Sequence, residues 1–430
     1  MRSERIDWKM LFLGMFSLTQ ITLIGKIGIS EIIVLLAAPI VYFRNQQLFK
    51  RDGVNGFLLL CFLWLGGAIF ADLFNHVTFA RSARGLACPI VILGTVVYLY
   101  PILRRNPSRF KWLLLGIAIS HVITIFAFQR GVAGDLASAG DTAGAIDRVV
   151  RYKLFWVNML TTWLTLPITG WYGKTPKWLA CSLLLFLSGY ALIGGGGRSA
   201  FLVLFVSFIL IVMVGKRQMS MLWIKKNFIV LILVLGVGGL CAKGVYKHAA
   251  KSGLMGAGEL GKYEEQTKEG GGVLKLLMAG RSDFFIGVFC ALREPIIGYG
   301  SHGADKYNCT EEFLNKYGNA SDRKMAETIM RKGWYMDVSA HSHIVTFWAF
   351  HGIFGLIFWV YALKLVIDTL RKRMHIMPEM YGYFACVIPT LCWDIPFSPF
   401  GLRMPCCLAF VMMLIAKAVE RQSSRQGRLR

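Results

Sequence analysis

Apolar stretches of 15 to 20 residues recur along the whole 430-residue chain, and they constrain its fold more than any other feature. A helix of about 20 apolar residues is long enough to cross the hydrocarbon core of a bilayer. Hydrophobic residues make up 55% of the chain, more than a soluble core would need. The pattern predicts an all-α integral membrane protein. The first stretch, from Leu11, has no A-x-A-like cleavage site and is predicted to remain as a span.

Twelve segments are candidate transmembrane helices: residues 9–25, 29–43, 54–72, 85–103, 111–129, 152–171, 177–194, 199–215, 228–246, 343–367, 381–395 and 402–418. The chain contains no internal sequence repeat. It also lacks an inverted pair of glycine-broken helices, which would indicate a transporter.

The meaning of the formal charge of +24 depends on where the Lys and Arg residues lie relative to these spans. If the first connection lies outside, the inner segments hold 24 of the 48 Lys and Arg, and the short outer segments hold nine. Positive residues favour the cytoplasmic side, so both termini are predicted to lie in the cytoplasm. The charge is therefore mainly a topology signal, and no nucleic-acid partner is expected.

One connection differs from the others. Residues 247–341 carry 13 Lys and Arg together with 12 Asp and Glu, half of all acidic residues in the chain. We expect a mostly helical outer subdomain here, inserted between the ninth and tenth helices. Residues 275–292 are predicted to form an amphipathic helix on the membrane surface or in the subdomain core, and residues 311–331 a second, polar helix. The chain thus divides into helices one to nine (1–246), this loop subdomain (247–341), and helices ten to twelve with a basic tail (342–430).

Eight of the ten cysteines fall in or beside predicted spans, where cysteine packs as a small apolar residue. Only Cys290 and Cys309 lie in the outer segment. Their spacing leaves open whether they form a disulfide or stay free. No C-x-x-C or His/Cys cluster indicates zinc, so no metal is expected.

Three polar residues near the outer ends of the spans are candidate functional groups, because ionisable groups at membrane depth need a partner or a function. Arg198 follows a glycine run, and its guanidinium suits phosphate oxygens; otherwise it is an interfacial arginine. Arg281 would begin the amphipathic helix, where its side chain and the helix terminus face an anion, or else it is a solvated loop residue. His341 lies where the long loop re-enters the membrane, and imidazole suits a general base. His343 and His351 compete with it, although His351 fits a packed, hydrogen-bonded helix histidine better.

These residues lie in three motifs that together resemble the O-antigen ligase and O-antigen polymerase superfamily of bacterial envelope glycan enzymes. The first is Gly197-Arg198-Ser199-Ala200 at the outer start of a span. The second runs from Arg281 to Phe285 and continues as Pro295-x-x-Gly298-x-Gly300, and the third is His341-Ser342 with Gly352 and Gly355. The resemblance covers residues 180–365. Phe285 stands where family members often have Trp, and the loop between Gly300 and His341 is long.

The resemblance implies a GT-C-like glycosyltransferase in the bacterial inner membrane, with its active site facing the periplasm. Its donor would be a glycan on undecaprenyl pyrophosphate, and its acceptor lipid A-core or another lipid-linked glycan. No cofactor is implied, and the chain has no Asp-x-Asp, so a metal-independent reaction is expected. Attack from the side opposite the pyrophosphate would invert the anomeric centre.

In this interpretation Arg198 and Arg281 stabilise the pyrophosphate leaving group, and His341 deprotonates the acceptor hydroxyl. Five further residues are assigned to substrate binding: Arg81, Arg84, Phe285, Tyr299 and His343. For Arg81 and Arg84 the alternative is snorkelling to the interface, and for Phe285 packing within the outer subdomain.

Several functions remain open at this stage. Ligation to lipid A-core is placed slightly ahead of repeat-unit polymerisation, because His341-Ser342-x9-Gly352 matches the ligase motif. A transporter or flippase would suit twelve spans, but its path should carry polar groups at the midplane, where this chain has few. A structural scaffold would give no reason for Arg and His at the membrane boundary.

Overall fold

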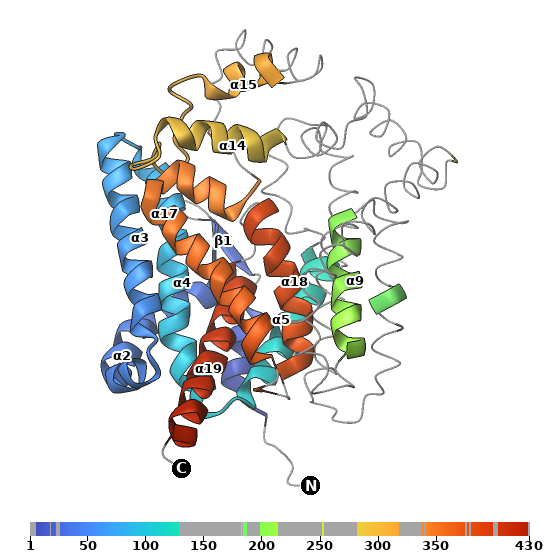
Figure 1. Ribbon diagram of the computed structural model, residues 1–430. Coiled ribbons are helices and arrows are strands. Elements are labelled where there is room, and N and C mark those ends of the chain that lie inside the picture. Colours follow the sequence, from blue (N-terminus) through green and yellow to red (C-terminus); the bar gives the residue numbers. More distant parts are fainter. Residues whose placement is uncertain are drawn as a thin grey trace.

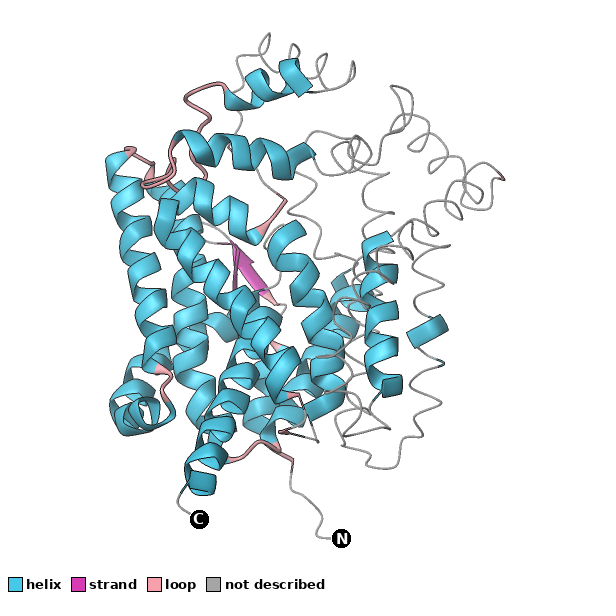
Figure 2. Ribbon diagram, in the orientation of Figure 1, coloured by secondary structure: helices cyan, strands magenta, loops and turns pink. Residues whose placement is uncertain are grey.

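The computed structural model of the chain describes residues 6–17, 19–22, 26–128, 182, 184–186, 198–213, 252, 282–317, 338, 341–374, 376–377, 380–398 and 403–428. Helices account for most of this part, with one two-stranded hairpin (Figure 2). The predicted spans 152–171 and 228–246, and most of 177–194, lie outside the described residues.

Long helices stand side by side and form a bundle (Figure 1). In chain order the elements are α1 (Trp8–Met15), β1 (Gln20–Thr22), β2 (Lys26–Gly28), α2 (Ile29–Asp52), α3 (Asn55–Phe74), α4 (Phe79–Arg105), α5 (Arg109–Phe128), α9 (Arg198–Met213), α14 (Ser282–Arg293), α15 (Cys309–Tyr317), α17 (His343–Asp368), a π-helical turn (Thr369–Arg373), α18 (Tyr381–Phe397) and α19 (Arg403–Arg428). Both termini lie at one end of the bundle, and α14 and α15 lie at the other (Figure 1). Which end faces the cytoplasm stays a prediction.

Four described helices are long and apolar enough to cross a membrane: α2, α3, α4, and α17 with the π-helical turn that follows it. Large apolar side chains on their outer faces are exposed, among them Leu36 (75%) and Phe79 (76%). Such surfaces suit contact with lipid. The chain is therefore a mostly helical membrane protein. The count of twelve spans and the GT-C-like arrangement stay predictions.

The N-terminal segment differs from its prediction. The sequence predicted one helix over residues 9–25, but α1 ends at Met15 and an antiparallel hairpin follows, in which Gln20 pairs with Gly28. The backbones of α1 and α5 approach each other closely at two glycines. A side chain at Gly14 would collide with the carbonyl of Leu113, and one at Gly116 with that of Leu11. Apolarity alone did not distinguish a short packed helix from a full span.

Buried aromatic rings form much of the bundle core. Trp64 of α3 stacks on Phe358 at 4.5 Å and meets Phe347 edge-on at 4.9 Å, and both partners belong to α17. At the end that holds the termini, the buried Asp52 accepts hydrogen bonds from Tyr100 and Arg104. The ring contacts join α3 to α17, and the Asp52 contacts join the end of α2 to α4.

A second, smaller core lies at that opposite end. Its buried residues come from α14, the turn after it, α15, the connection before α17 and the first turns of α17: Ile286, Cys290, Ala291, Tyr299, Cys309, Phe313, Leu314, Val338, Ala349 and Phe350. The predicted turn after residue 293 is confirmed, because α14 ends at Arg293. Of the two interpretations of the amphipathic helix, this packing favours a core helix of the outer subdomain.

Candidate functional site

The start of α17 is held by a helix cap. The Oγ of Ser342 accepts a hydrogen bond from the backbone N–H of Val345 at 3.1 Å and donates one to the carbonyl of Ile395 in α18 at 3.3 Å. Serine is favoured at this position because its short side chain satisfies an otherwise unpaired amide. His341 therefore lies one residue before the cap, at the end of the bundle opposite the termini. The region around His341 and Asp283 is called the mouth of the bundle below.

His341 meets an acidic partner there. Its Nδ1 lies 2.5 Å from Oδ2 of Asp283 in the first turn of α14, and both side chains are partly open, with exposed fractions of 39% and 45%. The contact is close, although its geometry is not that of a hydrogen bond. Within the described residues no hydrogen bond occupies Nε2 of His341. A carboxylate beside one ring nitrogen orients the imidazole and leaves the other nitrogen available to a substrate.

Aromatic rings lie close to this pair in the chain. Phe284, next to Asp283, contacts Phe397 at the end of α18, with ring centroids 5.8 Å apart, and meets Phe285 edge-on at 5.3 Å. Phe285 also packs against the core of the outer subdomain. His343 is buried, and its ring lies 4.7 Å from that of Trp359. Of the two histidines at the mouth, His341 is thus the accessible one.

The second and third sequence motifs meet at a break in α17. Gly352 adopts φ +60°, which interrupts the helix. The backbone amides of Tyr299 and Gly300 then donate to the carbonyls of Ala349 and Phe350 at 2.8 and 2.9 Å. Backbone from the turn after α14 therefore satisfies carbonyl groups that the break exposes.

Glycine is required on both sides of this junction. A side chain at Gly352 would come within 1.9 Å of the carbonyl oxygen of Ile296, and one at Gly298 within 2.6 Å of the amide nitrogen of Gly352. Gly298 also has a positive φ of +81°. The glycines that carried the family resemblance thus have a structural reason, the close approach of two backbones.

His351, beside the break, is fully buried in a polar network. Its Nδ1 accepts from Nε1–H of Trp64 at 2.8 Å, and its Nε2 lies 3.1 Å from Oγ of Ser301. Ser301 donates in turn to Asp72 through its backbone amide (2.5 Å) and its hydroxyl (2.9 Å), and Ser82 also donates to Asp72 at 2.6 Å.

This network fixes the chemistry of His351. Because Trp64 can only donate, Nδ1 must be the accepting nitrogen, and Nε2 carries the proton that it donates to Ser301. His351 cannot then take a proton from Ser301, so the pair is not an activated nucleophile. The prediction of a packed, hydrogen-bonded histidine is confirmed.

The two predicted phosphate-binding arginines lie at the edge of the described structure. The backbone of Arg198 begins α9, while its side chain, and Arg281 just before α14, lie outside the described residues. Tyr381, the first residue of α18, donates to the carbonyl of Leu210 near the end of α9, and the two helices stand side by side (Figure 1). Arg198 therefore begins α9 at the end of the bundle where α18 reaches Phe397.

The remaining predicted substrate contacts have different surroundings. Arg81 and Arg84 lie in the first two turns of α4, at the same end of the bundle as the outer subdomain, and Arg84 is the more exposed. Tyr299 is only 2% exposed. Its hydroxyl donates to the carbonyl of Cys290 at 3.1 Å and contacts Sγ of Cys309 at 3.3 Å. In this conformation Tyr299 packs the outer subdomain and does not face solvent.

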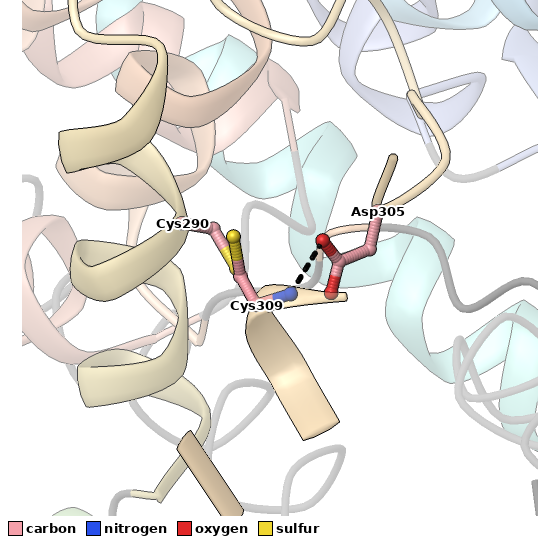
Figure 3. Close-up of side chains that lie close together, drawn as sticks. All are labelled: Cys290, Asp305 and Cys309. Carbon is pink, nitrogen blue, oxygen red and sulfur yellow. Dashed lines mark hydrogen bonds between the residues drawn. The ribbon is translucent and has the colours of Figure 1, made fainter. Parts of the chain in front are cut away.

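One group of potential metal ligands exists in the described part, although the sequence led us to expect none. Sγ of Cys290, Sγ of Cys309 and a carboxylate oxygen of Asp305 lie within 4.8 Å of one another (Figure 3). Both oxygens of Asp305 already accept backbone amides, from Cys309 at 2.9 Å and Thr310 at 2.7 Å. The carboxylate thus caps α15, and the arrangement does not need an ion to explain it.

Asp283 is the residue that sequence reasoning missed. It stands two positions after Arg281 in a predicted amphipathic helix, where an acidic residue in the first turn is ordinary. Nothing in the local sequence relates it to His341, because their contact depends on how α14 lies over α17.

Comparison of the sequence with models of known protein families, and with curated proteins, gave no match. The functional interpretation therefore depends on the residues themselves.

Proposed function

We propose that this protein is a metal-independent, inverting glycosyltransferase that moves a glycan from undecaprenyl pyrophosphate to an acceptor hydroxyl at the periplasmic face of the inner membrane. The observation that carries the proposal is the half-exposed His341 beside Asp283, at the end of the bundle opposite both termini. The junction between the second and third motifs adds support, because it brings residues chosen from sequence into one structural unit.

His341 is the general base in this proposal. Asp283 holds the Nδ1 side of the ring, so Nε2 accepts the proton of the acceptor hydroxyl. The acceptor oxygen then bonds to the anomeric carbon as the carbon–oxygen bond to pyrophosphate breaks. The carboxylate of Asp283 offsets the charge of the imidazolium that forms. Attack from the face opposite the pyrophosphate inverts the anomeric centre.

The arginines stabilise the pyrophosphate leaving group in this proposal. A pyrophosphate gains negative charge as its bond to the sugar breaks, and permanently charged guanidinium groups can stabilise it without a metal. Arg198 and Arg281 are assigned this role, with Arg81 and Arg84 as weaker contributors. Apolar rings at the mouth, Phe284 and Phe285, are suited to contact the prenyl chain or the sugar of the donor.

Ligation to lipid A-core remains our first choice, and repeat-unit polymerisation is the alternative with the same chemistry. Reconstitution of the purified protein in proteoliposomes with one lipid-linked donor and each acceptor separates them. Transfer to lipid A-core supports the ligase. Formation of only longer lipid-linked chains would reverse the order, and movement of donor across the bilayer without any transfer would favour a flippase.

A substitution tests the role of Arg198 in the same assay. Arg198→Ala should abolish glycan transfer while leaving membrane insertion intact, because the pyrophosphate loses its partner. Arg293→Ala is a matched control, since Arg293 lies at the end of α14 and pairs with Glu312 on the surface at 2.6 Å. Full activity in Arg198→Ala would refute the assignment.

A further inference from the structure

The paired cysteines of the outer subdomain are the feature that the proposed reaction does not use. Cys290 lies in α14 and Cys309 begins α15, and both are fully buried free thiols. Figure 3 shows their sulfur atoms next to each other between the two helices. Every other cysteine of the chain lies in or beside a predicted span, so this pair is the only one in the outer segment.

We propose that Cys290 and Cys309 form a structural disulfide in the protein at its site of action. The bond links α14 to α15 and closes residues 291–308 into a covalent loop. The proposal uses the predicted outward orientation of the subdomain, where disulfides persist, and does not depend on glycan transfer.

The surroundings favour a disulfide over a metal ion. Burial raises the pKa of both thiols, and the negative charge of Asp305 raises it further. A cation would have to remove two thiol protons and compete for carboxylate oxygens that already cap α15. A disulfide leaves no buried charge and keeps the cap intact.

The bond would hold together the parts that position His341. Segment 291–308 contains the turn whose backbone pairs with α17 at Gly352, and also Ser301, which bonds to His351 and Asp72. Asp283 lies on the same helix as Cys290. A covalent link at the base of the segment restricts the unfolded chain and stabilises this junction.

Oxidation requires a disulfide-bearing thiol oxidoreductase of the outer compartment. One cysteine thiolate attacks the disulfide of the oxidant, which gives a mixed disulfide and releases one thiol of the oxidant. The thiolate of the second cysteine then attacks the cysteine sulfur in the mixed disulfide and releases the second thiol. Two protons leave the protein, and two electrons pass to the oxidant. Because burial suppresses thiolate formation, exchange occurs while the segment folds.

Differential labelling of the purified full-length protein tests the proposal. Free thiols are first blocked with N-ethylmaleimide in denaturant. The protein is then reduced, the newly freed thiols are labelled with isotopically heavy N-ethylmaleimide, and both labels are mapped by mass spectrometry. Cys290 and Cys309 should carry the second label, while Cys406 and Cys407 carry the first. The first label on both outer cysteines would overturn the proposal. The same labels together with one bound zinc per chain would assign the pair to a metal site instead.

Thermal unfolding gives an independent measurement. A membrane-permeant reductant should lower the midpoint of the wild type by about 5 °C. It should do the same in Cys392→Ser, a matched control in α18, and have no effect in the double variant Cys290→Ser/Cys309→Ser. A wild-type midpoint that reductant does not move would contradict a stabilising bond. If the double variant does not fold, the labelling of the wild type decides alone.

Discussion

The mouth and the break of α17 each place a histidine near a carboxylate, but with opposite consequences. At the mouth, His341 is 39% exposed and touches Asp283 through one nitrogen. At the break, His351 is fully buried and both its nitrogens have partners, Trp64 and Ser301. A histidine can accept a substrate proton only through a nitrogen that is both accessible and unoccupied. Among the described residues, none hydrogen-bonds to Nε2 of His341, so the mouth suits chemistry and the break suits architecture.

The same contrast holds for the carboxylates. Asp72 near the break is buried and accepts three hydrogen bonds, from the amide and hydroxyl of Ser301 and from Ser82. The side chain of Asp283 at the mouth is 45% exposed and contacts His341, the candidate general base, directly. A fully satisfied carboxylate rigidifies its surroundings, whereas one with spare acceptor capacity can respond to a charge that forms beside it.

The largest expected effect is at the mouth. His341→Ala should lower the rate of glycan transfer by roughly 10²- to 10⁴-fold, because the general base is lost, and should leave donor binding largely intact. Rates in proteoliposomes and binding of radiolabelled donor measure the two effects. His343→Ala should be milder because His343 is buried. A dead His343 variant with an active His341 variant would mean that the base is misassigned, and two active variants would remove the base-catalysed mechanism.

The next effect is at the break. Gly352→Ala should destabilise the protein by about 3 kcal/mol, because alanine is strained at φ +60° and its side chain would collide with the carbonyl of Ile296. The fraction that stays monodisperse after heating, measured by size-exclusion chromatography, reports the loss. Gly66→Ala in α3 is the matched control, since nothing lies within 4 Å of the added methyl group. Equal stability in both variants would show that the junction is not a stability element.

A smaller effect on catalysis separates Asp283 from His341. Asp283→Asn should lower kcat by roughly 10- to 100-fold with little change in KM, because the amide no longer stabilises the imidazolium. Asp283→Glu should recover part of the loss. An unchanged kcat would remove Asp283 from the mechanism.

The smallest effect tests the structural role of His351. Trp64→Phe keeps an aromatic ring against Phe358 but leaves Nδ1 of His351 without its donor, which should cost about 1–3 kcal/mol of stability. Activity per folded molecule should stay the same. Thermal inactivation and single-turnover rates at low temperature measure the two quantities. A variant with normal stability and impaired turnover would assign the network a part in the reaction.

Local sequence patterns predicted the bounds of several helices well. Apolar stretches placed α3, α5 and α17 within a few residues, and the turn after Arg293 follows ordinary turn preferences. The start of α4 was predicted at residue 85, whereas the helix begins at Phe79. The hairpin after α1 was missed because residues 21–24 (Ile-Thr-Leu-Ile) extend the apolar run that begins at Leu11. The backbone conformation of the hairpin is decided by packing, which hydropathy does not record.

The sequence by itself determined that this is a helical membrane protein with its termini at one end, and it singled out His341 and the glycines near it. Those features depend on hydrophobicity, charge and backbone freedom, which act within a few turns of the chain. Only the tertiary structure decided that Asp283 meets His341, that His351 is locked between Trp64 and Ser301, and that Cys290 and Cys309 lie together. Each of these pairs joins different helices or turns, and their contact depends on how those elements dock, because residues remote in sequence have no spacing that encodes their distance.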